Sequence, residues 1–599
     1  MRRLSLFLLL LLAASPLLAQ SGVWGARGVS HAFLVRDNLV YDVDGRGVAV
    51  YDVSNPAAIR RTAVIDSEAE SLDGAFLANG DLAVLTRAGV DIYDRGTLGL
   101  RAQIPGHGFA HLRANENWIV AASANGATAW ANDLTEVRRM TFASAVSAIA
   151  LKGDALYAAL GEGGVDVVDL TGARDVSVLA ENAQDLAVAG DNLYVASGVN
   201  GLVVADATDP FAPRVTRREG AGTMNLAHVA VAGTKIFASE SPSTIHVFDD
   251  AGEVARIDDA VQTLAASGTR LFVSGTIFDK FGLPTETGLP LRVYDVAAAP
   301  KLLGDVKDLA GPVSGAATDG TLAYIVDRPF FRVIDVSTTS APRELASLAI
   351  DNIEDHVKLL GKQVILYGRG DVDLVDVSDP YHPKLAKVFH SFGRPPSNAA
   401  FARNTIVEGN PWSGFHVVDF INYPEPGQIG GIKGHYYEVV ANGGDVAYIA
   451  GEGVSIAAID LRDPHNPVGT KLIHVGVKQA FITGNDLVVR SSDGLHVYSL
   501  ADPFNPTETS FVPMTEPGVA GPADGAALVW IDDALVRADL AAGTAVASGL
   551  TALAPMQIDG AGGKTVVADR YGLRVFGPNT APPPPPPPQP PARRRAARP

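Results

Sequence analysis

Three polar residues, His31, Asp185 and His228, are of types that can hold a metal ion together. Each lies six residues before the first hairpin turn expected in a repeat of the sequence. The same spacing gives three further polar residues, His356, Asn398 and Gln479. Imidazole and carboxylate are ordinary ligands for zinc or iron, so the first three residues are candidate ligands of a divalent cation. The alternative is a solvated position that accepts any polar side chain, and no other cofactor is expected.

No familiar catalytic signature occurs in the 599 residues. A nucleophile elbow, a His-Glu-x-x-His helix, a phosphate-binding loop and an EF-hand loop are all missing from the sequence. The chain has no cysteine, which excludes thiol nucleophiles, disulfides and thiolate zinc sites. We therefore predict no catalytic residues and favour a non-enzymatic role.

The elements that must position the candidate residues are copies of one repeat of about forty residues. The phrase GLVVADATDP (201–210) returns in related form as DLVDVSDP (373–380) and AAIDLRDP (457–464). In most copies an Asp closes the phrase, and we call this position the anchor. The anchors of the successive copies are Asp52, Asp94, Asn132, Asp169, Asp206, Asp249, Asp295, Asp335, Asp376, Asp419, Asp460, Ser499, Asp539 and Gly577.

Each copy reads as four short strands joined by tight turns. Residues 185–219 contain the runs DLAVAG, NLYVASG, GLVVADA and PRVTRRE, separated by Gly, Asn, Asp and Pro. Repeated four-stranded units are typical of a β-propeller, whose blades bury their faces on one another.

This pattern predicts an all-β fold of tandem β-propellers with four-stranded blades. Two seven-bladed rings are the simplest division, at 20–309 and 310–578, and six plus eight blades is the alternative. The last copy ends in its third strand, and residues 22–28 (GVWGARG) are expected to supply the missing outer strand.

The phrases GLVVADATDPFAP, RVIDVSTTSAP and DLVDVSDPYHP resemble the LVIVD repeat, a β-propeller motif of secreted and cell-surface bacterial and archaeal proteins. The resemblance extends over most of the chain from about residue 29 to 578. It implies export and surface recognition, and it transfers no active site because the motif consists of strand cores and turns.

The loop between the second and third strands of a blade should open on the channel mouth, where first strands begin. Two such loops carry aromatic residues that are candidates for binding: Phe278 and Phe281 in the insertion 275–290, and Trp412 in 408–413. The alternative is that Phe278 and Phe281 pack on their own blade.

The first 19 residues have the order of a secretory signal peptide. Arg2 and Arg3 precede an apolar run from Leu4 to Ala14, and a cleavage site follows Ala19. An apolar run of about eleven residues is short for a membrane span, which needs roughly 20, so no transmembrane segment is predicted. The mature protein is expected to be exported, either to the periplasm or to the cell surface.

Residues 579–599 form a tail rich in proline and arginine. Seven consecutive prolines (582–588) favour an extended conformation, and four arginines follow them. The tail is expected to be disordered, and its arginines are candidates for contact with anionic surfaces. The chain as a whole has a formal charge of −18, which argues against nucleic acid as a partner.

The leading functional hypothesis is an exported, non-enzymatic binding scaffold that recognises a protein or glycan at the cell envelope. The alternative is a propeller enzyme, a metal-assisted hydrolase or lyase, with its site at the channel mouth. The two differ in a measurable way, because the second requires a bound metal ion.

Overall fold

The structure is a computed structural model of the whole chain. It describes residues 21–24 and 30–580, apart from short gaps at 68, 175, 180, 241–242, 260, 279–283, 307–312, 328–329, 351–353, 369–371, 390–397, 421–426, 442, 452–454, 524–525, 532–533 and 553. The predicted signal peptide, Phe281 and the tail beyond Thr580 lie outside the described residues.

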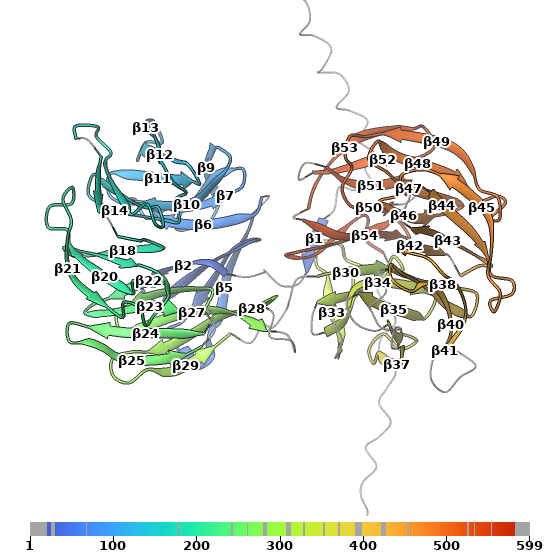
Figure 1. Ribbon diagram of the computed structural model, residues 1–599, viewed down its shortest axis with the longest axis horizontal. Helices are drawn as coiled ribbons and strands as arrows, with labels where there is room; N and C mark the ends of the chain where they lie inside the picture. The colour runs from blue at the N-terminus through green and yellow to red at the C-terminus, as the bar shows by residue number, and fades with distance from the viewer. Residues whose placement is uncertain are drawn as a thin grey trace, which may run out of the picture. The chain divides into compact units, whose positions relative to one another are not determined.

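The described part of the chain is all-β, as predicted, and forms fourteen separate four-stranded antiparallel sheets. Its one helical element is the short 3-10 turn Pro56–Ala58. The chain divides into two compact units (Figure 1). We call Ala26–Gly311 the N-terminal unit, and Pro312–Pro599 together with Met1–Gly25 the C-terminal unit.

The N-terminal unit contains seven of the sheets, drawn from blue to green in Figure 1. Their strands, in sheet order, are β2 (Ser30–Arg36), β3 (Leu39–Asp44), β4 (Gly47–Asp52), β5 (Arg60–Asp66); β6 (Ser71–Phe76), β7 (Leu82–Thr86), β8 (Gly89–Tyr93), β9 (Leu100–Pro105); β10 (Phe109–Ala114), β11 (Trp118–Ser123), β12 (Gly126–Ala131), β13 (Glu136–Thr141); β14 (Ala148–Lys152), β15 (Ala155–Ala159), β16 (Val165–Asp169), β17 (Ser177–Leu179); β18 (Asp185–Ala189), β19 (Asn192–Ala196), β20 (Leu202–Asp206), β21 (Arg214–Glu219); β22 (Leu226–Ala232), β23 (Lys235–Glu240), β24 (Thr244–Asp249), β25 (Gly252–Asp258); β26 (Thr263–Ser267), β27 (Arg270–Phe278), β28 (Pro284–Asp295) and β29 (Lys301–Asp305).

The C-terminal unit contains the other seven sheets. Their strands are β30 (Gly315–Thr318), β31 (Leu322–Asp327), β32 (Phe330–Asp335), β33 (Arg343–Ala349); β34 (Glu354–Leu360), β35 (Gln363–Gly368), β36 (Val372–Asp376), β37 (Lys384–Phe389); β38 (Asn398–Ala402), β39 (Thr405–Asn410), β40 (Gly414–Asp419), β41 (Gly427–Ile432); β42 (Tyr436–Ala441), β43 (Val446–Gly451), β44 (Ser455–Asp460), β45 (Val468–His474); β46 (Gln479–Thr483), β47 (Asp486–Arg490), β48 (Gly494–Ser499), β49 (Thr507–Pro513); β50 (Ala520–Ala523), β51 (Ala526–Ile531), β52 (Ala534–Asp539), β53 (Thr544–Thr551); and β54 (Pro555–Ala561), β55 (Lys564–Asp569), β56 (Gly572–Phe576) with β1 (Ser21–Trp24).

The first strands of the sheets contact one another in cyclic order within each unit. In the N-terminal unit the order is β2, β6, β10, β14, β18, β22 and β26, and β26 returns to β2. In the C-terminal unit it is β30, β34, β38, β42, β46, β50 and β54, and β54 returns to β30.

Apolar clusters between neighbouring sheets hold each cycle together. The clusters that join the last sheet to the first pack Phe33 of β2 with Phe272 of β27, and Ala316 of β30 with Val566 of β55.

The N-terminal strand β1 completes the last sheet of the C-terminal unit. Its residues pair antiparallel with β56, from Ser21 opposite Phe576 to Trp24 opposite Leu573. Figure 1 shows this blue strand beside the red strands of the chain's end. The closure through the terminus is therefore as predicted. β1 belongs to the C-terminal unit, although the predicted range 20–309 includes it in the first propeller.

The anchor aspartates act as turn builders. Asp206 ends β20, and its Oδ1 accepts hydrogen bonds from the backbone N–H of Thr208 (2.9 Å) and from the Thr208 hydroxyl (2.6 Å). The Asp-Pro step that follows repeats the arrangement, because Asp209 Oδ1 accepts from the N–H of Phe211 (3.1 Å). Asp suits both places because its short side chain reaches the backbone two residues on.

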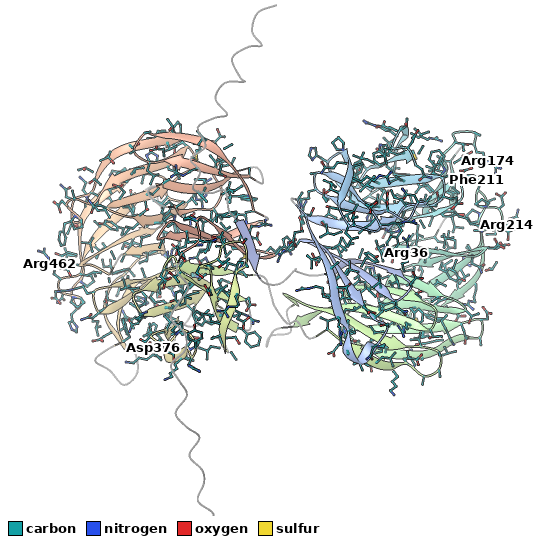
Figure 2. All side chains as sticks on the ribbon, turned by 180° about the vertical axis from the view of Figure 1, so that it is seen from behind. Arg36, Arg174, Phe211, Arg214, Asp376 and Arg462 are labelled. Atoms are coloured by element: carbon teal, nitrogen blue, oxygen red, sulfur yellow. The ribbon has the colours of Figure 1, made fainter. Side chains whose placement is uncertain are left out.

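The aromatic residue that follows the Asp-Pro step also joins neighbouring sheets. Arg174, just after β16, stacks on the ring of Phe211 at 4.3 Å (Figure 2), and Arg462 stacks on Phe504 at 4.5 Å in the same way. Such cation–π contacts at exposed sites stabilise by about 0.5–1 kcal/mol each.

Candidate functional site: the central cavity of the N-terminal unit

The seven first strands of the N-terminal unit surround a cavity of about 590 Å³. Every one of its sheets contributes lining residues, from Ala32 on β2 round to Thr263 on β26. This is the size of an ordinary small-molecule site, and its walls are part of a rigid strand framework.

All three predicted metal ligands line this cavity. Nδ1 of His228 lies 3.7 Å from Oδ2 of Asp185, and His31 is exposed near the start of β2. Among the described residues, no three His, Asp or Glu side chains are placed to share one ion. The metal role of His31, Asp185 and His228 stays a prediction.

His31 differs from the other two in register. His228 and Asp185 each lie four residues before the last paired residue of their strand, Ala232 and Ala189. His31 lies five residues before the corresponding Arg36, so Ala32 is the true equivalent. Each hairpin has two turn residues. The six-residue count starts from the first of them for His31 and from the second for Asp185 and His228.

A β-bulge near the start of the first strand aims the cavity residue. The register of β22 shifts between Leu226 and His228, and β6 shifts in the same way between Ser71 and Asp73. The first residue after the bulge lines the cavity in both strands. Bulges commonly redirect a side chain beside a functional site.

Sequence reasoning missed three residues of the cavity wall, and this rule finds two of them. Asp73 follows the bulge of β6, and His111 follows the bulge of β10, with Arg113 two residues further on the same face. The signal was available, because Asp73 lies six residues before Asn79 and His111 six before Asn117, each in its first hairpin.

Both cavity aspartates are fixed by hydrogen bonds to neighbouring strands. Oδ2 of Asp73, on β6, accepts from the backbone N–H of Leu112 (2.8 Å) and from Nη1 of Arg113 (2.8 Å), both on β10. Oδ2 of Asp185, on β18, accepts from the N–H of Val229 on β22 (3.0 Å). Since the first strands do not pair with each other, these carboxylates connect them at the cavity wall.

The charges of the cavity influence one another. The carboxylate of Asp73 raises the pKa of the Arg113 guanidinium, which therefore stays charged. Burial lowers the pKa of His111, although Asp73 acts in the opposite direction, so this ring is neutral near pH 7. The wall thus combines two carboxylates of fixed position, one guanidinium and three imidazoles, which is a set suited to hydrogen bonding with a polar ligand.

The structure describes Trp412 in full, Phe278 by its backbone alone and Phe281 not at all. Trp412 is 64% exposed, and its backbone N–H donates to Asn410 Oδ1 in a tight turn. Phe278 ends β27 opposite Pro284, but its side chain, like all of Phe281, lies outside the described residues. Glu408, at the start of the same predicted loop as Trp412, is buried and bonded to His416, so it does not face a ligand.

Fold and repeats together define the chain as a β-propeller protein of four-stranded blades. The family model of the LVIVD repeat matches residues 180–217 and 310–349, so the chain contains LVIVD repeats and the predicted resemblance is confirmed. No curated protein matches the sequence. In the part of the chain that the structure describes, no helix has the length and apolarity needed to cross a membrane.

Among solved structures the chain is similar to PorZ of Porphyromonas gingivalis, an essential bacterial surface component of the type-IX secretion system. The similarity has a TM-score of 0.64 at 11% identity and covers 93% of this chain and 87% of PorZ, so it concerns the fold. The computationally designed protein Ika8 is similar at 14% identity over 58% of this chain and 96% of its own, with a TM-score of 0.35 that supports no inference.

Proposed function

We propose that this protein is an exported, non-enzymatic scaffold of two seven-bladed propellers that binds a protein or glycan at the cell envelope. The leader sequence supports export, and the cyclic contacts among seven first strands in each unit support the ring count. PorZ, which shares the fold, is a bacterial surface component, and this agrees with an envelope location.

The observation that carries the binding role is the convergence of polar side chains from four different sheets on one cavity. Asp73, His111, Asp185 and His228 come from β6, β10, β18 and β22. The two carboxylates are held by backbone N–H groups, which positions them without movement and favours recognition.

The experiment uses the mature protein and a purified envelope fraction. We expect the wild type to co-sediment with envelope, and His31→Ala/His228→Ala to lose most of this binding. Both side chains are exposed, so their removal should leave the fold intact. Lys362→Gln, in an exposed hairpin of the C-terminal unit, is the control. Equal co-sedimentation of all three proteins would reject the cavity as the contact.

The 3.7 Å approach of His228 to Asp185 keeps a metal-assisted hydrolase or lyase as the second candidate. Elemental analysis separates the two functions. Stoichiometric zinc or iron that disappears in His228→Ala would favour the enzyme, whereas a metal-free protein that still binds envelope would favour the scaffold.

A further inference from the structure

The C-terminal unit has its own central cavity, of about 600 Å³, with a different set of charges. Its lining includes the cations Lys358, Lys478 and Arg490 and the acids Glu438 and Asp559. These come from β34, β46, β47, β42 and β54 or the segments beside them. Positive groups therefore outnumber negative groups in the wall of this cavity.

Lys358 is the cation available to a ligand. It is half-buried on β34, and no residue that the structure describes gives its ammonium a hydrogen bond or an ion pair. The other two cations are engaged. Nη1 of Arg490 donates to the carbonyl of Pro517 (2.6 Å) and its Nε to Gln479 (3.2 Å), while Nζ of Lys478 pairs with Glu516. An ammonium has three donors, so Lys358 keeps its full bonding capacity.

The two acids are bonded to backbone and do not pair with Lys358. Oε1 of Glu438 accepts from the N–H of Ala480 (3.1 Å), and Oδ2 of Asp559 accepts from the N–H of Thr318 (2.8 Å). Burial raises the pKa of both carboxyls, that of Glu438 to about 7, although the charge of Lys358 opposes this. Glu438 is thus partly protonated at neutral pH and only partly offsets the ammonium.

The remaining wall offers neutral polar groups and a flat surface. Asn398 lies at the start of β38, and His356 stacks on Tyr367 with ring centroids 5.1 Å apart. We propose that the central cavity of the C-terminal unit binds a small anion, carrying a carboxylate or phosphate group, through the ammonium of Lys358. This goes beyond the envelope-binding function, because it concerns the other unit and a ligand added in solution.

The test is calorimetric titration of the mature protein with sodium glucuronate and with inorganic phosphate, at constant ionic strength. We expect saturable binding of at least one anion, a loss of tenfold or more in affinity in Lys358→Gln, and no change in Lys362→Gln. Lys362 is an exposed lysine in the hairpin at the end of β34, so it is a matched control. Failure of both anions to bind, or equal affinity in Lys358→Gln, would overturn the proposal.

A pH series adds a second readout. The charged or titratable groups facing Lys358 and Glu438 are His356, Tyr367, Lys478, Arg490 and Asp559. Glucuronate stays ionised from pH 6 to pH 8, and its affinity should fall severalfold over this range as Glu438 ionises. In Glu438→Gln most of that fall should disappear. An unchanged fall in Glu438→Gln, or a missing fall in the wild type, would contradict the role of Glu438.

The outcome is independent of the envelope experiment. Anion binding that depends on Lys358 can coexist with failed co-sedimentation. Envelope binding without anion binding is also a clear result, because it rejects only the anion site. Thermal unfolding of each variant shows whether a lost affinity reflects a lost fold.

Discussion

The carboxylate of Asp73 bonds to the backbone N–H of Leu112 in the neighbouring sheet, at 2.8 Å. Asp185 repeats this contact with Val229, and Glu438 repeats it in the C-terminal unit with Ala480. In each pair, a polar residue that lines a cavity also connects two first strands that share no backbone pairing. The cavity residues therefore serve the ring as well as the site.

We expect Asp73→Ala to destabilise the N-terminal unit by about 1–3 kcal/mol, because a buried N–H loses its acceptor. Leu112 is fully buried, and the Asp73 carboxylate is the acceptor of its N–H. Urea unfolding followed by fluorescence measures the change. Asp37→Asn is the control, since Asp37 is exposed in a hairpin at φ 54°, where Asn is tolerated. Equal loss in both variants would contradict the structural role.

The anchors predict sensitivity to acid. Hydrogen bonds from Thr208 lower the pKa of Asp206, and those from Ser378 lower the pKa of Asp376. An acid with a lowered folded pKa stabilises the fold above its unfolded pKa, near 3.8, and this stabilisation is lost as the pH falls through the folded value.

Thermal unfolding measured from pH 6 to pH 2 tests this. Asp206→Asn/Asp376→Asn should lower the melting temperature at pH 6 and flatten its decline in acid. Asp305→Asn, an exposed residue outside the anchors, should behave as the wild type. An acid decline as steep in the double variant as in the wild type would count against the anchors.

The buried pair of His416 and Glu408 predicts a response of the opposite sign. Burial favours the neutral ring, but the Glu408 carboxylate, 2.8 Å from Nδ1, outweighs it and raises the pKa of His416 above 6.5. This stabilisation is present below the unfolded pKa and is lost as the pH rises through the folded one.

An NMR titration of the His416 ring measures this directly. We expect a pKa above 6.5 in the wild type and a lower one in Glu408→Gln. Titration of His416 below 6.5 in the wild type would show that burial dominates.

Removal of residues 20–24 should destabilise the C-terminal unit by a few kcal/mol and leave the N-terminal unit unchanged. The truncation removes β1 and exposes the edge of β56. Hydrogen exchange of β54–β56 compared with β2–β5 resolves the two units. A uniform response, or none, would contradict closure through β1.

Truncation of 581–599 is the matched control for stability at the other terminus. It spares Asn579 and Thr580, which bond to the body through Thr339 and Ser337, so the separable tail is shorter than the predicted 579–599. The arginine tail is proposed to contact anionic surfaces. A loss of the salt-sensitive part of envelope binding after this truncation would support that contact.

The sequence was most informative where geometry is local. The anchor at Asp206 and the turn at Asp209 depend on neighbours two residues away, so the repeat predicts them directly. The cavity depends on contacts between sheets, which no local pattern encodes. Ala32 and not His31 is the equivalent of His228, because the hairpin count starts from different turn residues in the two strands, and the bond of Arg113 to Asp73 joins residues 40 positions apart.

The most direct test of the central claim is a blocking experiment, which the absence of cysteine makes clean. Gln184→Cys places one thiol at an exposed position in the wall of the N-terminal cavity, and Lys362→Cys places one on an exposed hairpin. Each protein is labelled with a bulky maleimide, and its binding to the envelope fraction is compared with that of the unlabelled protein. The account predicts that labelling at 184 abolishes binding and labelling at 362 does not; full binding of the protein labelled at 184 would contradict it.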